Sequence, residues 1–252
     1  MTKRVIAAVL VLSGLAAWHL DLAPARAVRG LGNLLPLLRD ALPPQWSLMR
    51  VAGVALVETL SIALLGTVFG FLLALPLGVA GARTLAPRRV FLVARTVSAA
   101  IRSFPSLLWA VVFVILVGVH PTAGVLAMTL YSTGHFAKLQ AEGFEGLPAE
   151  PLEALRASGL GPLAIVRHAV LPDAANLLVS QALYMFDYNV RASAIVGFVG
   201  AGGIGFYIAR YLAALQYDGV LALVLVVFAT VLAIDALSFR LRARFRGASL
   251  EL

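Results

Sequence analysis

Apolar residues fill most of the chain, and only short groups of charged residues interrupt them. Six apolar runs approach or exceed the roughly 20 residues that a helix needs to cross a bilayer. They cover residues 5–20, 51–81, 90–119, 121–138, 173–192 and 219–239. The pattern predicts an all-α polytopic bundle of six transmembrane helices.

The third apolar run is broken by Arg102-Ser103-Phe104-Pro105. Proline has no backbone N–H to donate, and it pushes the residue before it away from helical angles. We therefore expect a helix, a bend at Pro105 and a short span after the bend.

The opening of the chain has two interpretations. Ala25-Arg26-Ala27 follows the first apolar run at a distance typical of a signal-peptidase site, but we expect a retained first span. Residues 21–50 contain four prolines and predict an interfacial connection. The predicted regions are residues 1–50 with the first span, 51–239 as the core with a loop at 140–172, and 240–252 as a basic tail.

Basic residues lie mostly in the connections between apolar runs, so the net charge of +8 indicates membrane topology rather than nucleic-acid binding. One side of the membrane would hold Lys3, Arg4, Arg83, Arg88, Arg89, Lys138, Arg156, Arg167, Arg240, Arg242, Arg244 and Arg246. The other would hold Arg26, Arg29, Arg39, Arg50, Arg191 and Arg210. The side with more basic residues is predicted to be the cytoplasm, so both termini and the 140–172 loop are predicted to be cytoplasmic.

Composition and motifs exclude several functions. Hydrophobic residues make up 61% of the chain and charged residues only 13%, too few for a water-facing surface. There is no cysteine, and the four histidines lack ligand spacing, so no metal site is expected. No phosphate-binding G-x-x-x-x-G-K-[ST] loop occurs, so the chain is not expected to hydrolyse ATP by itself. A membrane-embedded enzyme lacks a recognisable acid–base set, and a passive channel or scaffold remains the third alternative.

The loop at 140–172 is the most polar stretch of the chain. It contains Glu153-Ala154-Leu155-Arg156-Ala157-Ser158-Gly159, and Leu171-Pro172 follow eleven residues later. Pro151 favours a helix start, and Gly159 suits the left-handed cap at a helix end. Two short helices with a glycine corner are expected, and on composition alone they could form a simple solvated hairpin.

This spacing resembles the EAA loop of binding-protein-dependent, MetI-like ABC importer permeases. The resemblance implies a coupling helix that docks on a partner ATPase and transmits its closure to the membrane helices. By resemblance, the contact comprises Glu153, Ala154, Arg156, Gly159, Leu171 and Pro172. Leu155 replaces the second alanine of the family pattern and Ala169 its usual isoleucine.

Two further blocks, RSFPSLLWA at 102–110 and FDYNVRASAIVGFVGAGGIG at 186–205, resemble phosphonate permeases of the same superfamily. The resemblance implies an inner-membrane homodimer with two ATPase subunits that bind ATP and Mg²⁺, and an extracytoplasmic phosphonate-binding protein. The chain itself would touch lipid and hold no cofactor. Phosphite, phosphate or hypophosphite could replace phosphonate as the solute, and methionine permeases share the loop and the glycine run.

Polar residues in the fifth apolar run follow one helical face. They are Asn176, Ser180, Tyr184, Asp187 and Arg191. A lipid-exposed charge near the membrane centre costs at least roughly 2.5 kcal/mol, so this stripe should face protein or water. Asp187 and Arg191 could form a purely structural ion pair, or Arg191 could contact an oxyanion.

Further candidates for a translocation pathway are Asn189 in the same run and Arg102 with Ser103 at the bend. Arg102 could instead be an arginine whose charged head reaches the inner interface.

Gly200-Ala201-Gly202-Gly203-Ile204-Gly205 matches a dinucleotide-binding pattern and follows a strand-like run, 194–199. A second parallel strand should then follow, whereas the chain enters a further apolar run. We therefore interpret Gly200, Gly202, Gly203 and Gly205 as a tight bend or gate at membrane depth, which is tolerated where protein surrounds it.

Overall fold

The computed structural model describes residues 2–21 and 24–247, and all regular structure in those residues is helical. The helices are α1 (Thr2–His19), α2 (Pro24–Gly32), α3 (Leu34–Ala41), α4 (Met49–Ala80), α5 (Arg88–Arg102), α6 (Ser106–Val117), α7 (Pro121–Glu145), α8 (Ala149–Ala157), α9 (Pro162–Ile165), α10 (Leu171–Asp173), α11 (Ala175–Val196), α12 (Gly203–Ala213) and α13 (Tyr217–Gly247). Short 3-10 turns cover Trp46–Leu48 and Gly197–Val199, and a π-helical turn covers Val166–Val170. The all-α prediction is confirmed.

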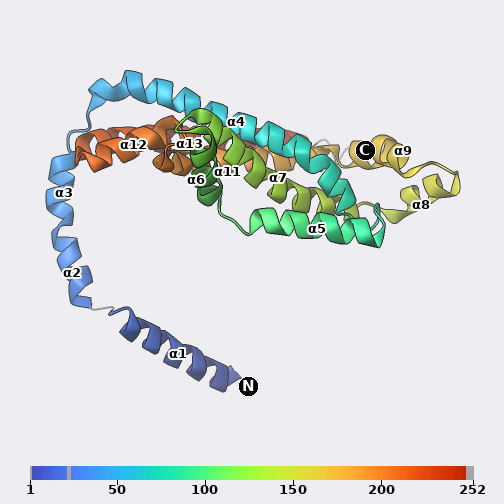
Figure 1. Ribbon diagram of the computed structural model, residues 1–252, viewed down its shortest axis with the longest axis horizontal. Helices are drawn as coiled ribbons and strands as arrows, with labels where there is room; N and C mark the ends of the chain where they lie inside the picture. The colour runs from blue at the N-terminus through green and yellow to red at the C-terminus, as the bar shows by residue number, and fades with distance from the viewer. Residues whose placement is uncertain (1, 22–23, 248–252) are drawn as a thin grey trace.

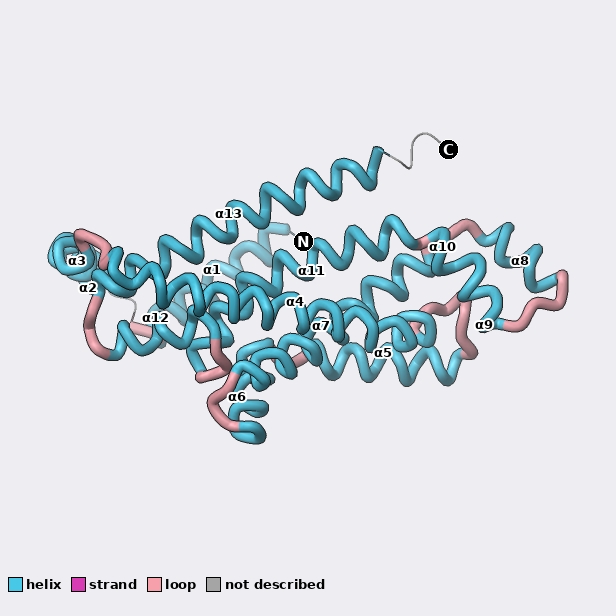
Figure 2. The backbone as a smooth tube through the Cα atoms, turned by 90° about the horizontal axis from the view of Figure 1, so that it is seen from above, coloured by secondary structure: helices cyan, strands magenta, loops and turns pink. Residues whose placement is uncertain are grey.

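The helices form an elongated bundle around α4, α7 and α11, with α13 along one side (Figures 1 and 2). Helices α8 and α9 lie at one end, and α12 lies at the opposite end, where α3 packs against α13. Helices α1 and α2 extend from that end as an arm (Figure 1). The predicted loop is thus at one end of the bundle, whereas the predicted glycine bend lies at the inner end of α12, against Thr59 of α4.

The number of membrane spans stays a prediction. Two helices in the described part of the chain are long and apolar enough to cross a membrane alone, Trp46–Ala80 and Tyr217–Arg240, and bent pairs raise this to at most four. Helix α7 is not among them because it is less apolar, yet it packs against α4, α5, α6 and α11. A helix that protein surrounds needs less apolar surface toward lipid.

Small residues on α4 allow it to lie almost in contact with α7. A Cβ atom on Gly66 would lie 2.5 Å from the Met128 Cβ, and one on Gly70 would lie 2.6 Å from the Ser132 Cβ. Ala74 and Gly78 continue this face at four-residue spacing, and Ala74 is fully buried. Close backbone approach through small residues is the usual way for helices to associate in lipid, where there is no hydrophobic drive.

The bend predicted at Pro105 is confirmed. Helices α5 and α6 meet at 82°, and Pro105 is the residue before the first turn of α6. The Ser103 N–H still donates to the Ala99 carbonyl, and the Trp109 indole N–H donates to the Ile101 carbonyl at 3.2 Å. The second bond satisfies the Ile101 carbonyl, which Pro105 leaves open because it has no N–H to donate.

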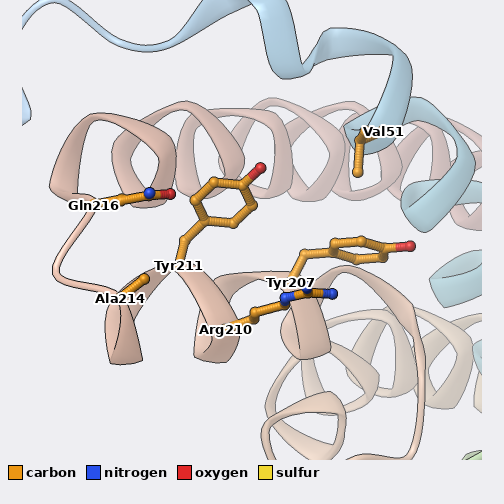
Figure 3. A pocket seen from close by; sticks show the side chains of 6 residues that line it. All are labelled: Val51, Tyr207, Arg210, Tyr211, Ala214 and Gln216. Carbon is orange, nitrogen blue, oxygen red and sulfur yellow. The ribbon is translucent and has the colours of Figure 1, made fainter.

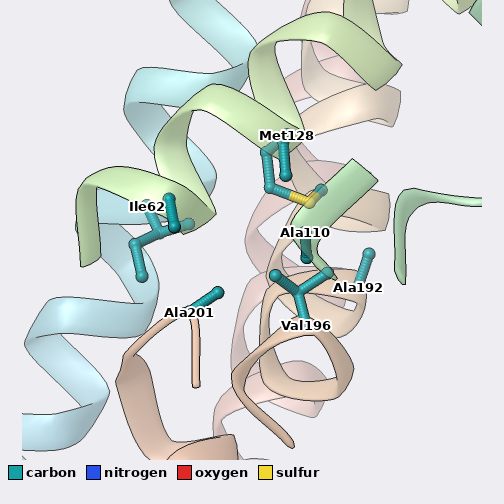
Figure 4. Packing of buried hydrophobic residues seen from close by; sticks show 8 residues of the cluster. Ile62, Ala110, Met128, Ala192, Val196 and Ala201 are labelled. Carbon is teal, nitrogen blue, oxygen red and sulfur yellow. The ribbon is translucent and has the colours of Figure 1, made fainter. Parts of the chain in front are cut away.

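A buried apolar cluster joins α4, α6, α7, α11 and the glycine run (Figure 4). Ile62, Met128 and Val196 are its large members, and alanines fill the remaining contacts. The strand-like run 194–199 is helical instead: it ends α11 and continues as a 3-10 turn. Val196 and Val199 pack into this cluster, so tertiary contacts override their strand preference.

The predicted boundaries shift where helices continue across them. Helix α13 runs to Gly247, so the last apolar run and the start of the predicted 240–252 tail form one helix. Residues 248–252 lie outside the described residues, and the Ala25-Arg26-Ala27 stretch falls within α2.

Candidate functional site

The predicted loop has the two-helix form that its sequence indicates. Helix α8 begins at Ala149, two residues before Pro151, and Gly159 follows its end with φ of +82°. The Gly159 N–H donates to the Arg156 carbonyl at 2.9 Å, and the Leu160 N–H donates to the Leu155 carbonyl at 3.3 Å. This paired bonding is the Schellman cap, which the left-handed glycine makes possible.

One face of α8 is anchored to the bundle and the other is open. Leu152 is buried in a cluster with Phe144, Ile165 and Val170. The Arg156 guanidinium donates to the Thr84 carbonyl in the α4–α5 turn. Candidate contact residues Glu153, Ala154 and Gly159 are exposed, whereas Leu171 is half-buried and Pro172 is exposed further along. The open face of α8 is therefore free to meet another protein.

The α4–α5 turn is also tied to the end of α7. The Glu145 carboxylate accepts from the Arg83 backbone N–H at 2.8 Å and from the Arg95 guanidinium at 3.0 Å. Arg95 also donates to the Gly81 carbonyl at 2.8 Å. Because Arg156 of α8 bonds to the same turn, this turn connects α8 with α4, α5 and α7.

The predicted polar stripe on α11 divides into two groups. Asp187 is buried and pairs with Arg191 through two contacts of 2.7 and 3.2 Å, and the Asp235 carboxylate of α13 lies 3.5 Å from the same guanidinium. Asn176 and Tyr184 are exposed on the surface of the chain, and Ser180 is half-buried with its hydroxyl on the Asn176 carbonyl. The ion pair forms as its spacing indicates, and two carboxylates already face Arg191.

Removing the charge of Arg191 should destabilise the protein more than removing the whole pair. Arg191→Gln leaves Asp187 buried without its partner, whereas Asp187→Asn with Arg191→Gln leaves no charge in the pair. For Arg191→Gln, the loss of unfolding free energy should stay below the roughly 3–5 kcal/mol that breaking a fully buried ion pair costs, because the Arg191 side chain is 43% exposed. Thermal unfolding of both variants in detergent measures this. A double variant less stable than Arg191→Gln would contradict a structural pair.

Asn189 lies inside the bundle. It is fully buried, and its amide donates to the hydroxyls of Thr67 on α4 and Ser132 on α7, each at 2.8 Å. These bonds connect three helices, and interhelical hydrogen bonds of this kind contribute about 0.6 kcal/mol each in membrane bundles. Its role in a pathway stays a prediction.

Arg102 lies in the last turn of α5. Its Nε atom is buried and unbonded, and its side chain passes over Gly134. The negative end of α5 offsets its charge by roughly 0.3–1 kcal/mol. Ser103 beside it is exposed and donates to the Ala100 carbonyl at 2.7 Å.

The glycine run makes a buried bend, as predicted. Gly200, Gly202 and Gly203 have φ of +91°, +85° and +73°. The Thr59 hydroxyl accepts from the Ile204 N–H at 2.8 Å and so caps the start of α12. A small cavity of about 180 Å³ lies beside the bend, with Glu58 and His120 in its wall.

A larger cavity of about 450 Å³ lies beyond the bend, between α4 and α12. Figure 3 shows the phenol rings of Tyr207 and Tyr211 and the Arg210 side chain along its wall. It is open to the surface at the end of the bundle farthest from α8. Neither cavity gathers metal ligands, and no group of three or more His, Cys, Asp or Glu side chains within residues 2–21 and 24–247 could hold a metal ion.

Comparison with known families decides what this bundle is. A family model described as the binding-protein-dependent transport system inner membrane component matches residues 66–247. The chain belongs to this family. A member of it is a transport subunit rather than an enzyme, and it works with a substrate-binding protein and an ATPase. The matched residues include α8 and the glycine bend.

Individual relatives agree with this membership. The phosphite transport system permease protein PtxC of Stutzerimonas stutzeri is 39% identical, and the match covers 92% of this chain and 85% of that protein. The phosphate-import permease protein PhnE of Mycolicibacterium smegmatis is 36% identical over 90% of this chain, which spans 43% of that protein's length. A solved inward-facing MetNI methionine ABC transporter superposes with a TM-score of 0.71 at 25% identity, covering 80% of this permease and 99% of that chain.

Three side chains near Arg102 escaped the sequence analysis: Tyr131, His135 and Tyr188. Tyr131 and His135 are four residues apart on α7, and Tyr184 and Tyr188 are four apart on α11, so each pair could have been recognised as one helical face. What the sequence could not give is that the two faces meet.

Proposed function

We propose that this chain is the permease subunit of an ABC importer for a phosphorus oxyanion such as phosphite or phosphonate. The observation that carries the proposal is the 39% identity to a phosphite permease over 92% of the chain. The phosphate-import and cryptic phosphonate permeases among its relatives support the same class of solute. Which of these anions is carried would depend mainly on the binding protein that delivers it.

The working complex would contain two copies of this chain, two ATPase subunits and one extracytoplasmic binding protein. Each chain supplies one α8, and two such contacts suit a pair of ATPases. ATP and Mg²⁺ would bind in the ATPases, because this chain has no phosphate-binding loop. The exposed part of the α11 stripe supports a homodimer, since a second copy would cover Asn176 and Tyr184.

Transport would follow from closure of the ATPases. Their closure on ATP would draw the two α8 helices together, and the bonds from Arg156 and Glu145 would carry this movement into α4, α5 and α7. The pathway would then open outward, and hydrolysis would reset it. The excess of basic residues supports a cytoplasmic position for α8 and for both termini.

Uptake by the reconstituted complex tests the solute. Proteoliposomes holding the permease, its ATPase and its binding protein should accumulate radiolabelled phosphite or methylphosphonate on addition of ATP. Unlabelled phosphite, methylphosphonate, phosphate and hypophosphite then compete separately, with sulfate and methionine as controls. We expect at least one phosphorus oxyanion to abolish uptake while both controls leave it unchanged. Competition by methionine alone would assign the permease to amino-acid import.

A further inference from the structure

A cationic and hydroxyl-rich cluster lies beneath the α5–α6 bend, and its members come from three helices. The Tyr131 and Tyr188 hydroxyls are 2.7 Å apart, and their rings stack with centroids 5.6 Å apart. The His135 ring centroid lies 4.3 Å from that of Tyr131, and the Arg102 side chain packs over Gly134, the residue before His135 on α7. We call Arg102, Tyr131, His135 and Tyr188 the tyrosine–arginine cluster.

Arg102 has no carboxylate to neutralise it. Among the residues that the structure describes, no acidic side chain comes within ion-pair distance of Arg102, and its buried Nε donates to nothing. Arg191 differs, because Asp187 and Asp235 both face it. A half-buried cation without a partner in a membrane bundle usually marks a functional site. The missing partner is an anion.

The neighbouring groups can form hydrogen bonds with that anion. One of the two tyrosine hydroxyls donates to the other, so one O–H hydrogen remains for a ligand. The His135 Nδ1 lies 3.1 Å from the Tyr131 carbonyl, which can only accept, so Nδ1 carries the hydrogen of the neutral ring. Its Nε2 is then an acceptor, which suits a protonated oxygen of a phosphorus oxyanion. A planar guanidinium beside hydroxyl donors suits an oxyanion.

The cluster is also reachable from the surface of the chain. Tyr184 lies one helical turn before Tyr188 on α11 and is 50% exposed. Tyr188 and Arg102 are both half-buried, whereas Tyr131 is buried beneath them. Lys138, one turn beyond His135, is 3.6 Å from Glu142 and so has its own partner. The unpaired charge of the cluster is therefore that of Arg102.

We propose that Arg102, Tyr131, His135 and Tyr188 form an intramembrane binding site for the transported oxyanion. This inference rests on the proposed function, since it takes the solute to be a phosphorus oxyanion. In this site the positive charge that stabilises the bound oxyanion comes from Arg102, whereas Arg191 stays in its ion pair with Asp187.

Uptake and ATP hydrolysis by the complete reconstituted complex test the site, with phosphite as the probe. Arg102→Gln removes the charge, and Tyr188→Phe removes one hydroxyl while it keeps the ring that stacks on Tyr131. Arg88→Gln is the matched control, because it removes the same charge from the exposed first turn of the same helix.

We expect Arg102→Gln to lower the maximal uptake rate at least about tenfold, because it removes a hydrogen bond from a charged group. Tyr188→Phe should lower the rate about fivefold, because it removes a neutral hydrogen bond. The KM for phosphite should change little, because the binding protein captures the anion first. ATP hydrolysis stimulated by the loaded binding protein should persist, so more ATP is used for each phosphite imported. Arg88→Gln should match the wild type.

Wild-type-like phosphite uptake per ATP in Arg102→Gln would overturn the site. If that variant does not assemble, Tyr188→Phe decides, and its wild-type-like rate would overturn the site equally. Failure of the proposed function is distinguishable, because the wild-type complex would then import no phosphorus oxyanion at all.

Discussion

Alanine in place of Gly205 should prevent the permease from packing its glycine bend against the end of α11. A Cβ atom on Gly205 would lie 1.8 Å from the Ala194 carbonyl oxygen and 2.8 Å from its carbon, and both are backbone atoms that no rotamer change can move. The position is fully enclosed, so α12 as a whole would have to shift. Overpacking typically costs about 1–3 kcal/mol and occasionally more, and we expect a loss at or above the top of that range.

Thermal unfolding and size-exclusion chromatography of the purified permease measure this loss. The matched control is Gly53→Ala in α4, where a Cβ atom would meet nothing within 4 Å. That change should be neutral or slightly stabilising, because alanine favours a helix by about 1 kcal/mol over glycine. Equal unfolding temperatures for the two variants would show that α12 does not pack on α11 in this way.

Valine in place of Gly159 should uncouple ATP hydrolysis from uptake while the bundle stays folded. Nothing lies within 4 Å of a Cβ atom at Gly159, so the penalty comes from its φ of +82° rather than from a clash. The left-handed conformation costs roughly 1–2 kcal/mol for a residue with a Cβ atom and more for a β-branched one. The cap would open, and α8 would lose its orientation toward the ATPase.

We expect uptake to fall at least about tenfold, since 1.4 kcal/mol is a factor of ten, with little change in unfolding temperature. Gly161→Val is the control, because Gly161 also has open space around it but an ordinary φ of −70°. Gly159→Asn should retain more uptake than Gly159→Val, because asparagine tolerates this conformation. Equal uptake by Gly159→Val and Gly161→Val would remove the case for a conformational role.

Local chemistry made some of the structure predictable. Pro105 predicts its bend because a proline cannot donate, and Gly159 predicts its cap because few other residues adopt its backbone angles. The Asp187–Arg191 pair follows from spacing along one helix. In each case the determining atoms lie within a few residues of one another, so the sequence contains the whole cause.

Contacts between distant helices were not predictable in the same way. The meeting of Tyr131 with Tyr188 depends on how α7 lies against α11, which no local pattern encodes. The spacing of the polar residues on α11 predicted a single face in one environment. In the structure Tyr184 on that face is exposed, whereas the neighbouring Asn189 is enclosed by α4 and α7. The small residues at 66, 70, 74 and 78 do have a visible four-residue period, which could have predicted a close helix partner for α4 but not that the partner is α7.

The contact between α4 and α7 limits how the permease can change shape. Because Gly66 lies on Met128 and Gly70 on Ser132, sliding one helix along the other by part of a turn would drive side chains into backbone. The two helices should therefore travel as one rigid body through the transport cycle. The 82° bend between α5 and α6 and the boundary with the proposed second copy are then the places to attach labels that report on opening.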